Sequence, residues 1–223
     1  HVKEILKSRA KVIDINIIES NLEDIQISDE LFGALFSYPD TNGDIKYHKD
    51  ILADLKKNNT CIISYNDLLS LLLLKPPGEL GVDISLGTTQ RFGLPLWFGG
   101  PHSAFFSVRD DFLRYLPGRI VGKTKDRNDN ECFRLALQTR EQHIKKERAT
   151  SNICTSQALL ANTSAMYAIY HGKEGLINIA KDIYLKTNTL RYFINLISVK
   201  TKNNFTFDTI TFFHHDVNNM SKL

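Results

Sequence analysis

Hydrophobic residues in the first ninety positions of the chain gather in short runs that polar segments separate. Three of these runs have the length of a strand, and they cover Leu31–Tyr38, Thr60–Tyr65 and Val82–Leu86. Between the first two, His48–Asn59 carries apolar residues at Ile51, Leu52 and Leu55, a spacing typical of a helix that packs on a sheet. Strands and helices that alternate in this way predict an α/β layer with parallel strands.

The neighbouring segments add further expected elements. The pattern predicts helices at Val2–Arg9, Leu68–Leu74 (buried) and Val108–Leu116, and strands at Lys11–Ile18 and Ser103–Val108 (buried). Two apolar stretches on either side of the polar turn Asp126–Glu131 predict a β-hairpin.

The last third of the chain predicts two successive helices and a strand. Ser156–His171 is rich in alanine and nearly free of charge, which favours a buried helix, and Gly172 follows where a helix end often takes a left-handed residue. Lys173–Leu196 is amphipathic, and Phe205–Phe213 alternates like a strand. We expect residues 1–197 to form part of a large domain, incomplete at its N-terminus, and residues 198–223 to begin a smaller, truncated subdomain.

Composition and charge restrict the classes of protein that need to be considered. The 223 residues are 42% hydrophobic and 24% charged, as in a soluble globular protein. A net charge of +3 gives no basis for binding nucleic acid or an anionic membrane, and no apolar run approaches the roughly 20 residues of a membrane span. Three widely spaced cysteines, Cys61, Cys132 and Cys154, predict free thiols and no metal site.

Three stretches have a composition that helix or strand periodicity does not require. They are KPPGE at Lys75–Glu79, GTTQRFGLPLWFGGPH at Gly87–His102 and REQHIKKERATSNICTSQALLAN at Arg140–Asn162. Together they resemble the P-protein family of the glycine cleavage system, which are glycine decarboxylases that use pyridoxal phosphate (PLP). The resemblance extends from about Leu31 to about Asp208. It implies the PLP-dependent transferase fold of the aspartate aminotransferase class (fold type I), with a mostly parallel sheet and flanking helices.

Long P-proteins are two similar halves in tandem, and the chain resembles a piece of the N-terminal half. In the C-terminal half, the turn that matches Gly87–His102 carries the lysine that forms the Schiff base with PLP. Gln90 stands at that position, and its neutral amide is neither a nucleophile nor a base. The neighbouring Arg91 stays protonated and cannot replace the lysine. The resemblance therefore implies no catalytic residue and no covalent PLP in this chain.

Three other residues near Gln90 are vestigial candidates for cofactor binding. A PLP site needs a carboxylate beside the ring nitrogen, and Asp67 lies 23 residues before Gln90, near the offset found in this fold class. Thr88 and Thr89 are candidates for the phosphate. The alternatives are that Asp67 caps a helix and that the threonines make hydrogen bonds within the turn.

The second candidate region consists of a basic stretch and a run of small polar residues after it. The basic stretch contains Arg134, Arg140, Lys145, Lys146 and Arg148 beside Glu141 and Glu147, and the polar run is Thr150–Gln157. From charge alone, the basic stretch predicts a solvated face with salt bridges. The polar run precedes an apolar helix, whose first N–H groups could receive an anion or a partner's polar loop. The resemblance implies a surface that packs on the catalytic half and helps to wall the cleft for glycine and the carrier protein. The candidate interface or cleft residues are Arg140, His143, Thr150, Ser151, Asn152 and Thr155.

The resemblance also implies a reaction and a set of partners. The family, glycine dehydrogenase (decarboxylating), is an oxidoreductase that decarboxylates glycine with PLP and transfers the aminomethyl group to the lipoyl group of H-protein. PLP would be bound by the other half, and the present half would complete the fold and the cleft. The expected partners are the C-terminal half of the P-protein, lipoylated H-protein, glycine and a second full-length chain. The expected location of this soluble protein is the mitochondrial matrix in a eukaryote and the cytoplasm in a bacterium.

Two other function classes are alternatives to part of a glycine decarboxylase. The first is a stand-alone, non-catalytic binding or regulatory module that pairs with a P-protein-like subunit. The second is an active aminotransferase-like enzyme, which Gln90 opposes because it removes the amine. The first residue, His1, looks like a cut point within a longer chain. We also expect the segment alone to be inactive and to fold poorly, since an apolar face meant for another half would be exposed.

Overall fold

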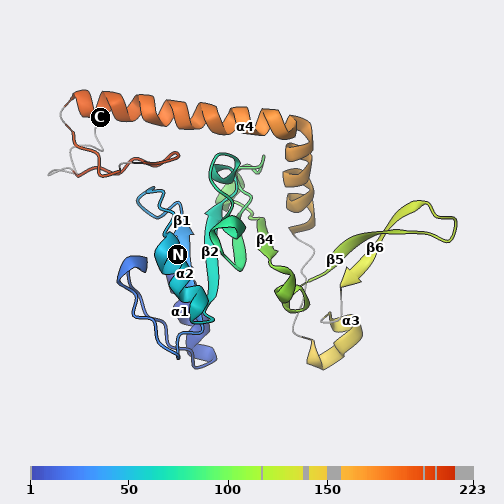
Figure 1. Cartoon of the computed structure of the whole chain (residues 1–223). Coiled ribbons are helices and arrows are strands. Elements are labelled where there is room, and N and C mark those ends of the chain that lie inside the picture. Colours follow the sequence, from blue (N-terminus) through green and yellow to red (C-terminus); the bar gives the residue numbers. More distant parts are fainter. Residues whose placement is uncertain are drawn as a thin grey trace.

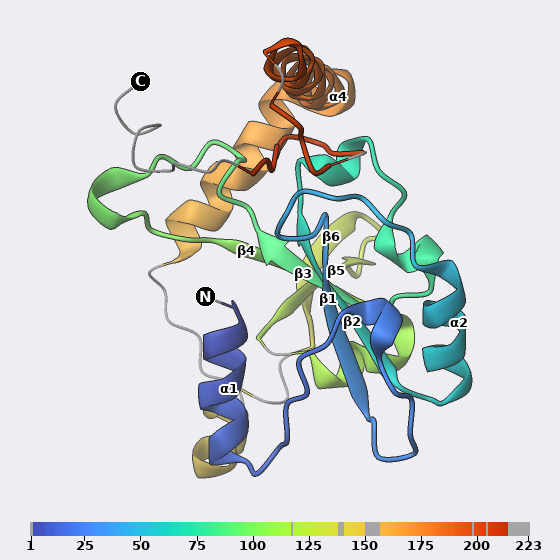
Figure 2. The same ribbon diagram turned by 90° about the vertical axis from the view of Figure 1, so that its left-hand side faces the viewer.

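The structure is a computed structural model that describes residues 2–116, 118–137, 141–149, 157–197, 199–203 and 205–213 (Figure 1). It is an α/β structure with a mixed sheet, a projecting hairpin and a long bent helix, as two perpendicular views show (Figures 1 and 2). Among the described residues, the sheet has four strands in the order β1 (Gly33–Tyr38), β2 (Cys61–Asp67), β3 (Ile84–Thr88) and β4 (Ala104–Val108).

The topology of this sheet confirms the predicted fold class. Strands β1, β2 and β3 are parallel neighbours, and β4 runs antiparallel to β3. The three strands expected from the apolar runs are therefore present, with bounds shifted by a few residues. The expectation that Ser103–Val108 is buried is wrong, because β4 ends the sheet and most of its side chains are exposed, including Phe106 at 47%.

Two helices precede and follow β1. Helix α2 (Lys49–Lys57) covers β2 with its buried Leu52 and Leu55, as its apolar spacing predicts. Helix α1 (Val2–Val12) is longer than expected, and residues 13–18, all of them described, do not form the predicted strand. Strand propensity depends on neighbours to pack against, and Ile18 of this run is 74% exposed.

The main core lies at the carboxyl ends of the parallel strands. Tyr38 ends β1, Leu69 follows β2 and Phe92 follows β3, and all three are buried in one cluster with Leu176 and Phe207. A second cluster, between α2 and the sheet, contains Ala34, Leu52, Leu55, Ile62 and Val82.

Two helices predicted from apolar pattern are short 3-10 turns instead. Ser70–Leu72 replaces the longer helix expected at Leu68–Leu74, although Leu69 and Leu74 are buried as expected. Asp110–Tyr115 replaces the helix expected at Val108–Leu116. The first segment therefore buries apolar residues without a long helix, whereas Asp110–Tyr115 has no buried residue.

The predicted hairpin is confirmed and projects from the body of the molecule (Figure 1). Its strands β5 (Ile120–Lys125) and β6 (Glu131–Leu137) pair antiparallel, and the short helix α3 (Gln142–Lys145) follows. Val121 and Phe133 are 61% and 75% exposed on the ribbon. A two-stranded ribbon alone is marginally stable in water.

Helix α4 (Ala158–Leu196) is two helical arms joined at Gly172, as the sequence predicts (Figure 1). The φ of Gly172 is 62° and its ψ is −178°, a conformation that essentially only glycine adopts. The expectation that the first arm is buried is wrong, since Met166, Ile169 and Tyr170 are 62%, 72% and 85% exposed. Its lack of charge therefore does not correspond to burial within the described part of the chain.

We predict that Gly172→Ala destabilises the protein by about 1–3 kcal/mol, because a Cβ at this backbone conformation is strained whatever the space around it. Urea unfolding of the two proteins measures the difference. Gly78→Ala is the matched control, because Gly78 has no left-handed φ and a Cβ there meets nothing within 4 Å. Equal losses for the two variants would contradict the assignment of strain to the bend.

The described tail, residues 199–203 and 205–213, folds back over the turn that follows β1. Among these residues the structure has isolated bridges, Asp44 to Thr206 and Thr201 to Phe212, in place of the strand predicted at Phe205–Phe213. The amide of Asn203 donates to the Asn42 carbonyl oxygen, and Phe207 is only 1% exposed. The alternating pattern does not produce alternating burial, since the consecutive residues Thr206 and Phe207 are both buried. The division of the chain at residues 197 and 198 stays a prediction.

Candidate functional site

The candidate site lies where parallel strands β2 and β3 end. Asp67 is the last residue of β2, Thr88 is the last residue of β3, and their Cα atoms are paired in the sheet register. Open α/β sheets bind ligands beyond the carboxyl ends of their strands. The structure thus brings Asp67, Thr88, Thr89 and Gln90 together, as the sequence predicts.

The carboxylate of Asp67 is engaged on both oxygens. Its Oδ1 accepts hydrogen bonds from the backbone N–H of Leu69 (3.3 Å) and from Nε of Arg91 (3.2 Å). Its Oδ2 accepts from the backbone N–H of Ser70 (3.0 Å) and from Nη2 of Arg91. The bonds to Leu69 and Ser70 favour the alternative interpretation, in which Asp67 caps the turn that follows β2.

Arg91 has a role that the sequence did not reveal. Its guanidinium forms ion pairs with Asp67 and Asp208 and lies over the ring of Phe207, with Cζ 5.3 Å from the ring centroid. Burial alone would lower the Arg91 pKa, but the hydrogen bonds and charges of Asp67 and Asp208 outweigh burial and raise it. Arg91 therefore ties the turn after β3 to the end of β2 and to the tail. No local pattern could show this, because Asp208 is 117 positions away.

The hydroxyl groups of both threonines are used within the chain. Thr88 Oγ1 accepts the N–H of Gln90 at 3.0 Å. The buried Thr89 donates its N–H to the Ser103 carbonyl oxygen at 3.0 Å, and its Oγ1 accepts from Oγ of Ser164, on α4, at 3.1 Å. These contacts favour the turn hydrogen bonds that were the alternative to phosphate binding.

The side chain of Gln90 closes its own loop. Its Nε2 donates to the carbonyl oxygens of Leu94 (3.2 Å) and Pro95 (3.3 Å). Its Oε1 is buried and has no hydrogen-bond partner in the described part of the chain. The amide faces the loop as a structural donor, and no acid–base or nucleophilic chemistry follows from this arrangement.

The residues at this turn do not fit PLP. The position that would carry the amine holds an amide, and the carboxylate that would face the ring nitrogen is paired with Arg91. The hydroxyl oxygens of Thr88 and Thr89 accept intrachain hydrogen bonds, from the Gln90 N–H and from the Ser164 hydroxyl. In the described part of the chain, no group of three His, Cys, Asp or Glu side chains could hold a metal ion. Gln90 and the paired Asp67 therefore offer neither a Schiff-base amine nor an open carboxylate at this turn.

The second candidate region is described only in part. His143 lies exposed in α3, whereas Arg140, Thr150, Ser151, Asn152 and Thr155 lie outside the described residues. Glu141 lies in the basic stretch, for which charge alone predicts a solvated face, but it is 3% exposed. Its Oε2 is 3.4 Å from Nε of Arg119, and within the described residues its Oε1 is buried without a hydrogen-bond partner.

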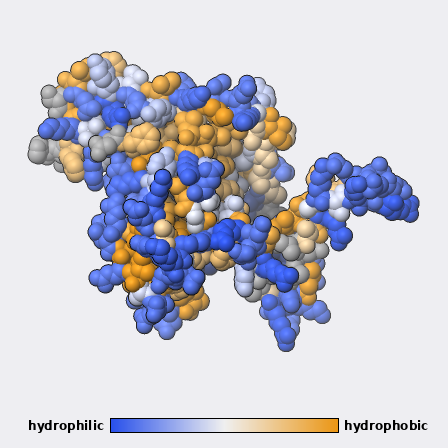
Figure 3. All heavy atoms as spheres, in the orientation of Figure 1, coloured by the Kyte–Doolittle hydropathy of each residue, from blue (hydrophilic) through white to orange (hydrophobic). Residues whose placement is uncertain are grey.

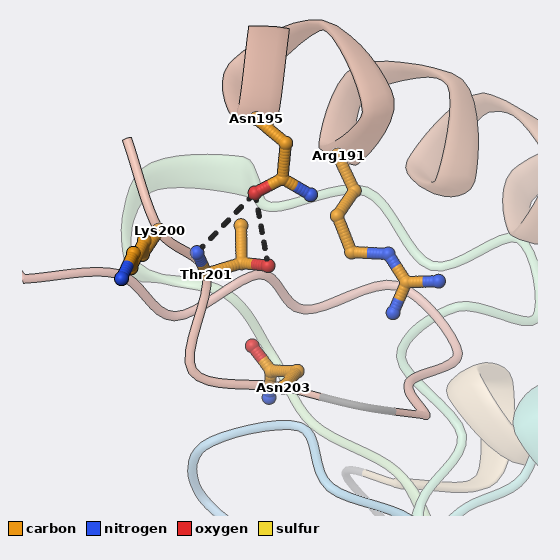
Figure 4. A pocket seen from close by; sticks show the side chains of 5 residues that line it. All are labelled: Arg191, Asn195, Lys200, Thr201 and Asn203. Carbon is orange, nitrogen blue, oxygen red and sulfur yellow. Dashed lines mark hydrogen bonds between the residues drawn. The ribbon is translucent and has the colours of Figure 1, made fainter. Parts of the chain in front are cut away.

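A polar hollow of about 390 Å³ lies between the end of α4 and the tail, away from these two regions (Figure 4). Its lining residues are Arg191, Asn195, Lys200, Thr201 and Asn203. The Oδ1 of Asn195 accepts from the N–H and hydroxyl of Thr201 at 3.4 and 3.5 Å. The described lining contains no carboxylate, histidine or cysteine, and we assign no chemistry to it.

Comparison with known proteins matches the whole chain to one family. The model of the family described as "Glycine cleavage system P-protein" matches residues 1–223. Mitochondrial glycine dehydrogenase (decarboxylating) of Dictyostelium discoideum is 47% identical over 215 residues, which cover 96% of this chain and 22% of the relative. The mitochondrial enzyme of Gallus gallus is 50% identical over 182 residues, or 82% of this chain and 18% of the relative. The chain spans about a fifth of the length of these relatives.

Solved structures agree with the family match. A crystal structure of glycine decarboxylase (P-protein) of the glycine cleavage system, in inhibitor-bound form, has a TM-score of 0.76 and 30% identity. The match covers 87% of this chain and 45% of that chain. A cysteine desulfurase from Thermococcus onnurineus NA1, at 11% identity and a TM-score of 0.57, covers 98% of this chain and 56% of that chain and shows the fold alone.

The described helices also bear on the membrane question. In the described part of the chain, none of the helices is both long enough and apolar enough to cross a membrane.

The family match confirms the resemblance seen in the motifs at Lys75–Glu79, Gly87–His102 and Arg140–Asn162, since the family model extends from the first residue to the last. The chain belongs to the glycine cleavage system P-protein family.

Proposed function

We propose that this chain is part of a glycine dehydrogenase (decarboxylating), in the half that lacks the Schiff-base lysine. The observation that carries the proposal is the state of the turn after β3, where the Gln90 amide bonds to its own loop and Arg91 pairs with Asp67. PLP, bound by the other half, supplies the electron sink that lets the glycine carboxylate leave as carbon dioxide. The present half serves as the structural and cleft-forming half.

Exposed apolar faces support a role beside another half. The first arm of α4 exposes Met166, Ile169 and Tyr170, and hydrophobic residues also gather around the bend of this helix (Figure 3). The end of the second arm exposes Tyr192 and Leu196, each by more than 60%. Apolar patches of this kind mark protein–protein interfaces. We assign these faces to the C-terminal half of the P-protein and to a second full-length chain.

The other proposed partners follow from the family and not from a described contact. Glycine and the lipoylated H-protein would reach a cleft that this half helps to wall, and the candidate cleft residues remain Arg140, His143, Thr150, Ser151, Asn152 and Thr155. Beside the mitochondrial enzymes, glycine dehydrogenase (decarboxylating) of the bacterium Dechloromonas aromatica is 46% identical over 209 residues. We accordingly propose the mitochondrial matrix in a eukaryotic host and the cytoplasm in a bacterial one.

The release of carbon dioxide from glycine tests this proposal. The protein at its natural length and the 223-residue segment alone are each assayed with PLP and lipoylated H-protein. We expect activity from the natural-length protein and none above the blank from the segment, since the segment has no Schiff-base lysine at residue 90. Carbon dioxide release by the segment alone would contradict the proposal.

The same assay separates the alternative of a stand-alone regulatory module. In that case a P-protein-like partner is fully active without this chain, and adding the chain only changes the rate. Under our proposal, the remaining part of the protein is inactive until residues 1–223 complete it. Full activity in their absence would favour the regulatory module.

A further inference from the structure

We infer that the guanidinium of Arg91 occupies Asp67, the carboxylate that would otherwise bind the protonated ring nitrogen of PLP. Arg91 therefore prevents cofactor binding at this turn, in addition to the missing lysine. The inference rests on the proposed function in one respect, which is that position 90 matches the Schiff-base lysine. It goes further because it concerns non-covalent binding. A site that had lost only its amine could still hold the cofactor, whereas this one has lost the carboxylate that would receive it.

The first support for this inference is that the hydrogen-bond acceptors of Asp67 are already occupied. An ionised carboxylate has about four acceptor positions on its two oxygens. Four donors fill them here, namely the N–H groups of Leu69 and Ser70 and the Nε and Nη2 groups of Arg91. A pyridinium N–H placed beside Asp67 would have to displace one of these donors.

The second support is the chemical likeness between the pyridinium ring of PLP and the guanidinium of Arg91. A PLP enzyme uses a carboxylate to hold the ring nitrogen protonated. The guanidinium is likewise a planar cation, and its fork of N–H groups matches a carboxylate at two points. Arg91 therefore satisfies Asp67 in the way that the cofactor ring would, from the residue next to the missing lysine.

The third support is that contacts with the tail hold Arg91 in place beside Asp67. Its Nη1 pairs with Asp208, and its Cζ lies 5.3 Å from the ring centroid of the buried Phe207. Moving the guanidinium away from Asp67 would also disturb the ion pair and the cation–π contact with the tail. Even with a lysine at position 90, the ring nitrogen of PLP would consequently find Asp67 occupied by Arg91.

Restoring the amine with and without Arg91 tests the inference in the protein at its natural length. Gln90→Lys and Gln90→Lys/Arg91→Gln are incubated with PLP and reduced with borohydride, and peptide mass mapping quantifies PLP bound at position 90. We expect little adduct in the single variant and about tenfold more or greater in the double variant, since removing a charge-assisted pair is worth at least one tenfold step in affinity. Adding Asp67→Asn to the double variant should remove the gain.

Circular dichroism confirms the folding of each variant. If Arg91→Gln weakens the fold, Gln90→Lys/Arg91→Lys keeps the positive charge without the fork and is expected to give an intermediate amount of adduct. Equal adduct in the single and double variants, or a gain that survives Asp67→Asn, would overturn the inference and leave the proposed function intact. PLP found on a lysine of the unaltered residues 1–223 would instead contradict the proposed function.

Discussion

Replacing Phe207 with alanine is expected to destabilise the protein by about 3–5 kcal/mol, the usual range for a buried phenylalanine. Phe207 is 1% exposed and packs in the main core with Tyr38, Leu69 and Phe92. Its ring also lies under the guanidinium of Arg91. The substitution removes the side chain that anchors the tail over the ends of the parallel strands. Urea unfolding at a fixed protein concentration measures the loss.

Phe205→Ala is the matched control for this prediction. Phe205 lies two residues earlier in the same tail but is 46% exposed, and its contact with Ile45 is a backbone hydrogen bond that the substitution leaves in place. Its loss should stay near 0.5 kcal/mol, as for most surface changes. Similar losses for the two variants would show that the tail does not belong to the core.

Gly87→Ala is expected to cost about 3 kcal/mol or more, at the upper end of the range for overpacking. Gly87 lies in β3 opposite Asn66 of β2. An alanine Cβ would stand 1.9 Å from the Asn66 carbonyl oxygen and 2.9 Å from Cε1 of Phe105. The closer atom is backbone in a paired strand, so it cannot move away without breaking the ladder. Thermal unfolding of the variant measures the cost.

Gly33→Ala provides the comparison within the same sheet. Gly33 lies in β1, and a Cβ there would meet only the Cys61 carbonyl oxygen, at an ordinary distance of 3.7 Å. We expect no more than a few tenths of a kcal/mol for this change, because it adds a methyl group without a clash. A variant of Gly87 as stable as the variant of Gly33 would contradict the close approach of β2 and β3.

Local pattern was sufficient for the elements whose neighbours are close in sequence. The apolar runs at β1, β2 and β3, the spacing of Leu52 and Leu55 on α2, and the polar turn between β5 and β6 each carry their own signal. Gly172 was placed correctly because a glycine between two helical patterns indicates a left-handed end. The family itself followed from motifs that periodicity does not explain.

The remaining features depend on contacts that no local pattern contains. Residues 11–18 have strand propensity but pair with no strand among the described residues, and Phe205–Phe213 alternates in sequence while only Phe207 of the stretch packs into the main core. The first arm of α4 is apolar yet exposed, since apolar composition does not distinguish a core from an interface.

The candidate site was predicted in position but only in part in its interactions. Asp67, Thr88, Thr89 and Gln90 meet because parallel strands bring their carboxyl ends together, which the order of elements predicts. The pairing of Arg91 with Asp67 and Asp208 was missed. It joins three segments far apart in the chain, and a single basic residue in a turn gives no sign of its partners.

The location of PLP in the natural-length protein shows whether residues 1–223 form a half without the catalytic lysine. The unaltered protein is reduced with borohydride in the presence of PLP, digested, and mapped by mass spectrometry. We expect the modified lysine to lie outside residues 1–223 and its modification to accompany loss of carbon dioxide release from glycine. Stoichiometric PLP on a lysine within residues 1–223 would contradict it.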